Sequence, residues 1–237
     1  MKAFLLAAGL GTRLKPITNS IPKCLVDICG KPLLGWWIDL FQKHAINKVL
    51  INLHHFSEQV IYFIESYNHN LSIEYFYEER LLGSGGTLRA NKDFVKEESS
   101  FFICYADNLT NYNLTEFFNF HKSKMSDFSM SLFKTDQPTA KGIALLNSDN
   151  VIIDFEEKPK KPKSEMANAG IYISSPRILD FIPNDQTTDI GFDLLPKLVG
   201  RMTGWKTSDY LIDIGTYKDL EKAKIEWEKI LKGNNEL

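Results

Sequence analysis

The residues best suited to chemistry form a short glycine-rich loop near the N-terminus, Gly9-Leu10-Gly11-Thr12-Arg13. Glycines let backbone N–H groups approach a polyphosphate closely, and the guanidinium of Arg13 can pair with its oxygens. A dinucleotide fingerprint would need a third glycine where Leu14 stands, and a Walker loop would need a following Gly-Lys-Ser/Thr. The loop therefore predicts a triphosphate cradle, and a purely structural tight turn is the alternative.

Two aspartates are expected at strand ends, one after a predicted buried strand and one after a short apolar run. Asp107 comes after residues 101–105, and Asp213 comes after residues 210–212. Ligands of α/β proteins bind beyond the carboxyl ends of the strands, so both carboxylates are expected at the ligand. Two converging carboxylates make an oxygen site for Mg²⁺, which bridges phosphates and keeps several waters. Either aspartate alone would also suit a helix cap or a turn.

The elements that must position these residues alternate between strand and helix. The patterns predict strands at 3–7, 48–53, 71–75, 101–105 and 128–133 and helices at 33–44, 57–67, 84–90 and 114–122. Ser57 is expected to cap the second of these helices. This alternation predicts an α/β, Rossmann-like fold with a mostly parallel mixed sheet flanked by helices.

The second half of the chain shows a different pattern. Residues 142–146 and 151–155 flank Asn147-Ser148-Asp149-Asn150, a turn-rich sequence that predicts a small antiparallel insertion. Thr216-Tyr217-Lys218-Asp219 resembles a capping box and predicts a final helix to about residue 231.

Composition narrows the function classes. The 237 residues carry a net charge of -2, with 24% charged and 43% hydrophobic residues, which is typical of a soluble protein and favours neither nucleic acid nor membrane as a partner. The short apolar start lacks the features of a signal peptide, and no segment is long enough to span a membrane, so we expect a cytoplasmic protein. Cys24, Cys29 and Cys104 are expected to be reduced thiols, and His54-His55 lacks partners for a zinc site.

A series of short motifs runs in order through residues 2–220. They are residues 9–18, Ile21-Pro22-Lys23-Cys24-Leu25-Val26, Gly30-Lys31-Pro32-Leu33, Leu82-Gly83-Ser84-Gly85-Gly86-Thr87, Asp107, Phe155-Glu156-Glu157-Lys158-Pro159, Asn168-Ala169-Gly170 and Asp213-Ile214-Gly215. Together they resemble the sugar-1-phosphate nucleotidyltransferase family, the nucleotide-sugar pyrophosphorylases, and most of all its mannose-1-phosphate guanylyltransferase branch. The resemblance implies a GT-A-like nucleotidyltransferase fold and an enzyme that joins a sugar 1-phosphate to a nucleoside triphosphate, releasing pyrophosphate.

The resemblance also implies roles for individual residues. The implied nucleotide-binding residues are Leu6, Ala7, Ala8, Gly9, Gly11, Thr12, Arg13, Lys23, Glu78, Leu82 and Gly83. The implied catalytic residues are Arg13, Lys23 and Asp107, and the implied Mg²⁺ ligands are Asp107 and Asp213. The implied substrate-binding residues are Asp107, Gly142, Glu157, Lys158 and Asn168. Taken alone, Lys23 and Glu156-Glu157-Lys158 would be read as surface charges.

Two positions depart from the family pattern. Ala106 stands where glycine is frequent, and Lys141 replaces an aromatic residue often seen beside the sugar.

Glu78 matches the family position that reads the base, although neighbouring Glu79 is an alternative reader. A carboxylate can accept both the N1–H and N2–H₂ of guanine, which favours GTP, with mannose or heptose 1-phosphate as the acceptor. UTP, dTTP and CTP are alternative nucleotides, and another sugar 1-phosphate or small phosphorylated molecule is an alternative acceptor.

We expect one nucleotidyltransferase domain over residues 1–237. Its nucleotide-binding part would span about 1–135, its sugar-phosphate part about 136–215 and its C-terminal helix about 216–232. A second activity is not expected, because little chain follows Asp213, and a homo-oligomer is left open. The rival hypotheses are a non-catalytic regulatory subunit that binds nucleotide sugars and a nicotinamide-dependent oxidoreductase.

Overall fold

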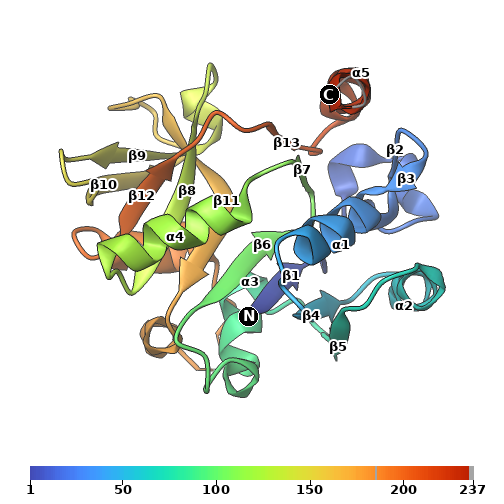
Figure 1. Cartoon of the computed structure of the whole chain (residues 1–237), viewed down its shortest axis with the longest axis horizontal. Coiled ribbons are helices and arrows are strands. Elements are labelled where there is room, and N and C mark those ends of the chain that lie inside the picture. Colours follow the sequence, from blue (N-terminus) through green and yellow to red (C-terminus); the bar gives the residue numbers. More distant parts are fainter. Residues whose placement is uncertain (185, 235–237) are drawn as a thin grey trace. The chain divides into compact units, whose positions relative to one another are not determined.

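The chain folds into two compact units that interleave along the sequence. The computed structural model describes residues 1–184 and 186–234 (Figure 1). Unit 1 comprises Met1–Phe4, Arg80–Cys104 and Asn113–Asp209, and unit 2 comprises Leu5–Glu79, Tyr105–Tyr112 and the chain from Tyr210 onward. Strands β1 (Lys2–Leu6) and β6 (Phe101–Tyr105) contribute residues to both units. The single functional domain expected from the sequence stays a prediction.

Unit 2 contains the first β-α-β repeats. Strand β1 is followed in the sheet by β4 (Lys48–Leu53) and β5 (Ser72–Tyr77), and β4 and β5 are parallel. The predicted helices are present as α1 (Leu33–Lys43) and α2 (Ser57–Ser66). Helix α1 forms because its apolar residues recur at helical spacing and are buried together, with Leu33, Trp37 and Phe41 at most 1% exposed.

The start of α2 differs from the prediction. Ser57 is the first helical residue and not the cap; Phe56 precedes the helix with a left-handed φ of 55°, and no side chain caps it. The helix holds because Val60 and Ile64 are buried, and tertiary packing outweighs a missing cap.

A two-stranded sheet, whose pairing the sequence patterns do not show, fixes Asp107 and Asp213. Strand β7 (Asn108–Thr110) pairs antiparallel with β13 (Leu211–Asp213), so that Asp213 lies opposite Asn108. The backbone N–H of Ile214 donates to the carbonyl oxygen of Asp107 at 3.0 Å. Trp37 of α1 ties the sheet to the core, since its indole N–H donates to the Asn108 carbonyl at 2.8 Å.

Two further parts complete unit 2. Strands β2 (Asp27–Ile28) and β3 (Lys31–Pro32) form a short hairpin before α1. Helix α5 (Tyr217–Asn234) follows β13, and the Thr216 hydroxyl oxygen accepts from the backbone N–H of Asp219 at 3.2 Å, which confirms the predicted cap. The rings of Trp36 and Trp227 meet edge-on at 5.2 Å and join α5 to α1.

Unit 1 holds the antiparallel part of the mixed sheet. Its strands follow the order β10-β9-β11-β6-β1, and β11 (Met166–Ser174) also pairs with β8 (Phe128–Lys134), which pairs in parallel with β12 (Thr203–Lys206). Strands β9 (Gly142–Leu146) and β10 (Ile152–Glu157) form the predicted antiparallel hairpin. The predicted mixed sheet flanked by helices is confirmed.

Two helices of unit 1 cover or adjoin these strands. Helix α4 (Leu114–Lys124) packs on β8 and β12, where the Phe117 ring stacks on Trp205 with centroids 5.0 Å apart (Figure 1). Helix α3 (Gly83–Ala90) begins at a turn in which Gly83 has a φ of 77°. That left-handed conformation favours glycine.

We expect Gly83→Ala to lower the free energy of unfolding by about 3 kcal/mol, because a side chain there suffers both the left-handed strain and an overlap. A Cβ atom at Gly83 would lie 2.4 Å from the carbonyl oxygen of Thr188. Gly200→Ala is the matched control, since Gly200 has a φ of 81° but nothing within 4 Å of its Cβ position. Urea unfolding of the two variants measures the difference, and equal losses would refute the packing argument.

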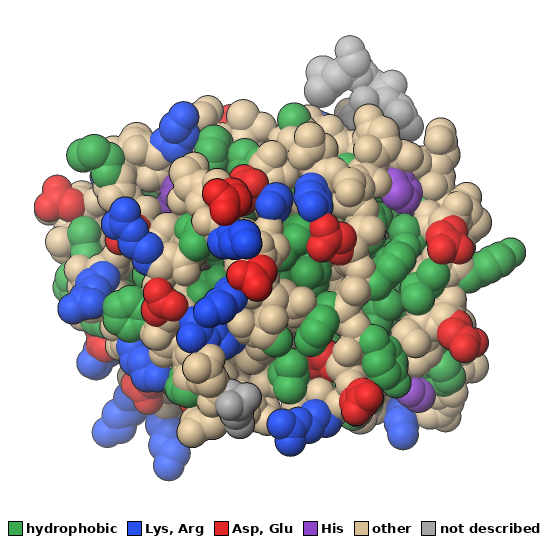
Figure 2. All heavy atoms as spheres, turned by 90° about the horizontal axis from the view of Figure 1, so that it is seen from below, with side chains coloured by type: hydrophobic (Ala, Val, Ile, Leu, Met, Phe, Trp, Pro, Cys, Tyr) green, Lys and Arg blue, Asp and Glu red, His purple; other side chains and the backbone are tan. Residues whose placement is uncertain are grey.

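The remaining expectations concern the surface and the thiols. The three cysteines form no disulfide. In the part of the chain that the structure describes, no helix has the length and apolar character needed to cross a membrane. Acidic and basic side chains both occur on the face shown in Figure 2.

Candidate functional site

Unit 2 brings three of the predicted catalytic and metal-binding residues together. The ammonium group of Lys23 donates to Asp107 Oδ2 at 2.6 Å and to Asp213 Oδ1 at 3.3 Å. The Lys23 side chain is 10% exposed, whereas the two carboxylates are 37% and 30% exposed. A nearly buried cation therefore sits between two carboxylates that a ligand can still reach. The alternative prediction that Lys23 is a surface lysine is therefore wrong.

The predicted phosphate loop lies against the same residues. Gly11 has a left-handed φ of 62°, and its carbonyl oxygen accepts from the Thr18 hydroxyl at 2.8 Å. A Cβ atom at Gly11 would lie 3.2 Å from Lys23 Cβ, whereas nothing lies within 4 Å of the Cβ position of Gly9. The loop backbone is thus close-packed on one side and open at Gly9, as a cradle for a polyphosphate requires.

Arg13 lies at the same cluster, on the turn Thr12–Leu14. A Cβ atom at Gly215 would meet both terminal nitrogens of Arg13 at 3.3 Å and Asp213 Oδ2 at 3.3 Å. Arg13 itself is exposed. Its guanidinium therefore adds a second cation, open to solvent, beside Asp213.

The side-chain amide of Asn52, which the sequence patterns did not single out, fixes the residues that follow β1. Asn52 Oδ1 accepts from the backbone N–H of Ala7 at 2.7 Å, and Asn52 Nδ2 donates to Glu78 Oε1 at 2.8 Å. The backbone N–H of Ala106 donates to the Leu6 carbonyl at 3.0 Å, which attaches the turn carrying Asp107 to the end of β1. These contacts arise between residues far apart in sequence, so no local pattern signals them.

The two candidate base readers differ in exposure. Glu78 is 2% exposed, and its backbone carbonyl also bonds to His54 Nδ1 at 2.7 Å. Glu79 is exposed. Asn52 thus orients the Glu78 carboxylate, while no such contact fixes Glu79 among the described residues.

The donor set of unit 2 fits a hard cation such as Mg²⁺. Within residues 1–184 and 186–234, no group of three or more His, Cys, Asp or Glu side chains is arranged to hold a metal. Mg²⁺ does not need such a group, because it binds proteins through one or two carboxylates and takes its other ligands from water and phosphates. Asp107 and Asp213 supply that pair, and the Lys23 ammonium between them marks a place where positive charge is favoured.

Unit 1 gathers the predicted sugar-phosphate residues around Glu157. A Cβ atom at Gly142 would lie 2.4 Å from Glu157 Oε2, and one at Gly191 would lie 3.0 Å from the same oxygen. Both glycines thus leave room for the carboxylate. Burial raises the pKa of Glu157; Lys158 lowers it, Asp189 raises it and Lys141 lowers it to smaller extents.

Lys158 and Asn168 complete this cluster. Lys158 has an unusual positive φ of 52°, and its backbone N–H donates to the Lys141 carbonyl at 3.1 Å. A lysine in this strained region is typical of functional sites. Asn168 is held at both ends of its amide, since Nδ2 donates to the Tyr172 hydroxyl at 2.7 Å and Oδ1 accepts from the Gly170 N–H at 2.9 Å.

The raised pKa of Glu157 predicts how Glu157→Gln affects stability. A carboxyl group with a raised pKa in the folded state binds more protons folded than unfolded, so its contribution to stability falls as pH rises above the ordinary value of 4.5. We expect Glu157→Gln to be more stable than wild type near pH 7, with the gain disappearing below about pH 4. The expected sugar-binding role of Glu157 predicts, in addition, that the variant has about 10- to 100-fold lower kcat/KM for a sugar 1-phosphate, since it lacks the charged hydrogen-bond acceptor.

Urea unfolding at both pH values and steady-state kinetics test this prediction. Glu156→Gln is the control, because Glu156 is the exposed neighbour on the same strand. A gain of equal size at both pH values would contradict the assigned cause.

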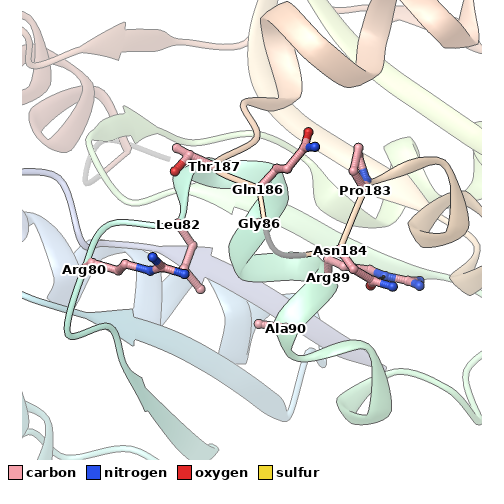
Figure 3. Close-up of a pocket in the computed structure, with 9 residues that line it drawn as sticks. All are labelled: Arg80, Leu82, Gly86, Arg89, Ala90, Pro183, Asn184, Gln186 and Thr187. Carbon is pink, nitrogen blue, oxygen red and sulfur yellow. Dashed lines mark hydrogen bonds between the residues drawn. The ribbon is translucent and has the colours of Figure 1, made fainter.

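The predicted nucleotide residues Leu82 and Gly83 lie in unit 1, beside a segment that sequence analysis did not single out. Thr188 donates its backbone N–H to the Leu82 carbonyl at 3.0 Å, and its own carbonyl accepts from Gly85 at 2.8 Å and Gly86 at 3.2 Å. A pocket of about 190 Å³ lies on this flank, and Figure 3 shows Gln186 beside Leu82 and Gly86. Leu82 is the only residue expected to bind nucleotide that lines this pocket. The pocket is therefore distinct from the triphosphate cradle predicted at residues 9–13.

Comparison with known proteins identifies related chains. A family model described as nucleotidyl transferase matches residues 2–229. The UTP–glucose-1-phosphate uridylyltransferase of Synechocystis sp. is 31% identical over 214 residues, which cover 84% of this chain and 55% of that protein. Mannose-1-phosphate guanyltransferase 2 of Candida glabrata is 30% identical over 226 residues, which cover 92% of this chain and 62% of that protein. The chain thus spans roughly three-fifths of the length of such curated relatives.

Solved structures show the same fold over nearly the whole chain. The crystal structure of HddC from Yersinia pseudotuberculosis complexed with GMP-PN has a TM-score of 0.81 at 28% identity and covers 95% of this chain and 99% of that one. The structure of a putative glucose-1-phosphate thymidylyltransferase from Bacillus anthracis in complex with a sucrose has a TM-score of 0.85 at 25% identity and covers 95% of this chain and 94% of that one.

Proposed function

Because the chain belongs to the nucleotidyl transferase family, we propose that it joins a nucleoside triphosphate to a sugar 1-phosphate, forming a nucleotide sugar and releasing pyrophosphate. The observation that carries this proposal is the position of Lys23 between Asp107 and Asp213, beside the open glycine loop. Cations and paired carboxylates beside an anion cradle are what the transfer of a nucleotidyl group requires.

The chemistry explains why such groups are needed. An oxygen of the sugar phosphate attacks the α-phosphorus, the bond to the β,γ-diphosphate breaks, and pyrophosphate leaves. A phosphate oxygen is already a nucleophile, so the reaction depends on positioning and charge neutralisation more than on a general base. Lys23 and Arg13 would neutralise charge as pyrophosphate leaves, and the backbone at Gly9, Gly11 and Thr12 would hold the triphosphate.

The proposed metal site is the pair Asp107 and Asp213. A bound Mg²⁺ supplies positive charge that neutralises the phosphates and orients them. The chain's own residues then hold the two reactants: Ala8 and the glycine loop would bind the nucleotide, and Lys158 would bind the sugar phosphate.

The proposed sugar residues lie in unit 1. Glu157 would accept hydrogen bonds from sugar hydroxyls, and Asn168 can both donate and accept. Gly142 would shape this subsite by leaving room for the Glu157 carboxylate. The strained backbone of Lys158 supports its proposed role at the phosphate.

GTP is the proposed nucleotide, with mannose or heptose 1-phosphate as the acceptor. Glu78 is the proposed base reader. Because it is 2% exposed and its carboxylate bonds to Asn52, the support for guanine comes from the similar proteins, which include a guanyltransferase and a GMP-PN complex. Uridylyl- and thymidylyltransferases are also among them, so UTP and dTTP belong in every test, as does CTP. We propose that the product is a cytoplasmic nucleotide sugar for cell-surface polysaccharides.

Pyrophosphate release tests the proposal. The four common nucleoside triphosphates and dTTP are assayed against mannose, heptose, glucose, N-acetylglucosamine and N-acetylmuramic acid 1-phosphates, with Mg²⁺ and with EDTA. We expect GTP with mannose or heptose 1-phosphate to be turned over only with the metal. If no pair of substrates released pyrophosphate although the nucleotide still bound, the result would contradict the proposed reaction and favour a regulatory subunit.

A further inference from the structure

The segment between Asp189 and Phe192 is fastened to the start of α3. The Ser84 hydroxyl donates to Asp189 Oδ2 at 3.0 Å and accepts from the backbone N–H of Ile190 at 2.8 Å. Thr188 also bonds to Leu82, Gly85 and Gly86. These contacts fix the segment against the turn that begins α3, where Leu82 and Gly83 are expected to bind the nucleotide. All of these residues belong to unit 1.

The same segment forms a single π-helical turn, Ile190–Leu194. Asp189 caps the turn, because its Oδ1 accepts from the backbone N–H of Phe192 at 3.1 Å. Its own backbone N–H donates to Asp193 Oδ2 at 2.7 Å. Turns of this kind are rare and often occur at functional sites.

The side chain that this turn presents is a largely exposed aromatic ring. Phe192 is 58% exposed, and the ammonium group of Lys158 lies 5.7 Å from its ring centroid. The residue before it, Gly191, has a Cβ position 3.0 Å from Glu157 Oε2. The exposed ring is thus next to the two side chains expected to bind the sugar phosphate.

Exposed aromatic rings are common on protein surfaces and alone need no explanation. Phe192 differs because its backbone is tied down while its ring stays in solvent, at a cluster of charged and polar groups. Ligand sites combine such an apolar surface with a few fixed polar groups. The C–H face of a sugar ring is an apolar surface that matches the ring, and the hydroxyls at its edge match Glu157.

We propose that Phe192 is the aromatic platform of the sugar subsite and determines its specificity, and that Ser84 and Asp189 position it. The proposal rests on the proposed function. Ser84 directly follows Leu82 and Gly83, which are expected to bind the nucleotide, so within unit 1 its hydroxyl adjoins residues expected to bind each substrate.

Steady-state kinetics of Phe192→Ala test the platform. Loss of the stacked face should raise the KM for the sugar 1-phosphate about tenfold and leave kcat and the KM for the nucleotide within about twofold. Phe192→Tyr and Phe192→Trp should restore the wild-type KM, since both keep an aromatic face. Phe181→Ala is the matched control, because Phe181 is also exposed and has Arg201 5.8 Å from its ring.

Ser84→Ala tests the positioning role. It should raise the KM for both substrates several-fold, since the link serves both, while Ser123→Ala, which removes a hydroxyl from the exposed end of α4, should change neither. Calorimetric titration with the sugar 1-phosphate repeats the Phe192 comparison without turnover.

The outcomes separate this proposal from the proposed function. A wild-type protein that releases no pyrophosphate with any substrate pair would contradict the proposed function itself. An active wild type whose sugar KM is unchanged in Phe192→Ala, or whose two KM values rise equally in that variant, would overturn the platform alone.

Discussion

Lys23→Ala should lower kcat/KM about 10³-fold, because it removes the cation proposed to neutralise the leaving pyrophosphate. The same change should tighten the binding of Mn²⁺, used as a spectroscopic probe, in the absence of nucleotide. Lys23 bonds to both Asp107 and Asp213, so it competes with a divalent cation for them. Two unit charges about 4 Å apart interact by about 1 kcal/mol in water and about 4 kcal/mol near a protein surface, so we expect binding to be tighter by at least about fivefold.

Electron paramagnetic resonance titration of Mn²⁺ measures the binding, and pyrophosphate release measures the turnover. Lys48→Ala is the matched control, because Lys48 pairs with Glu74 at 2.7 Å in the same unit, away from the aspartates. A variant with low turnover and weaker Mn²⁺ binding would show that Lys23 supports the metal site and does not compete with it.

Asp107→Asn should lower kcat about 10³-fold while the nucleotide still binds, because the amide keeps the shape of the side chain but loses its charge. The amide oxygen can still accept a hydrogen bond from Lys23, but it forms no ion pair with it and is not a charged metal ligand. Nucleotide affinity, measured by calorimetry, should change less than tenfold, since the glycine loop and Arg13 would still bind the triphosphate.

Asp149→Asn is the matched control, because Asp149 is exposed in the turn between β9 and β10. Equal losses of turnover and nucleotide affinity in Asp107→Asn would place Asp107 in binding alone. Unchanged turnover would remove the proposed metal site.

The features that could be predicted from the sequence are those that depend on interactions between residues close together in the chain. The glycine loop, the buried strands and the hairpin at residues 142–157 were found because glycine freedom and hydrophobic periodicity act over a few residues. The ordered motifs identified the family, which the match over residues 2–229 confirms. The exception, Ser57, shows that packing can form a helix without the expected cap.

Contacts between distant residues could not be predicted in this way. Asn52 meets Ala7 and Glu78 across 45 and 26 positions, and Ser84 meets Asp189 across 105 positions. No short spacing encodes such pairs, because the sheet and its connections bring them together. Strand β7 and its pairing with β13 could not be predicted for the same reason, because the apolar run before Asp213 is visible in the sequence but its partner strand is not.

The fate of the α-phosphorus tests the central claim most directly. The protein is incubated with Mg²⁺, a sugar 1-phosphate and a nucleoside triphosphate labelled at the α-phosphate, and the labelled products are separated. The account predicts that the label appears in a nucleotide sugar, with one pyrophosphate released for each molecule formed. Label recovered as free nucleoside monophosphate, or only as unchanged triphosphate bound to the protein, would contradict it.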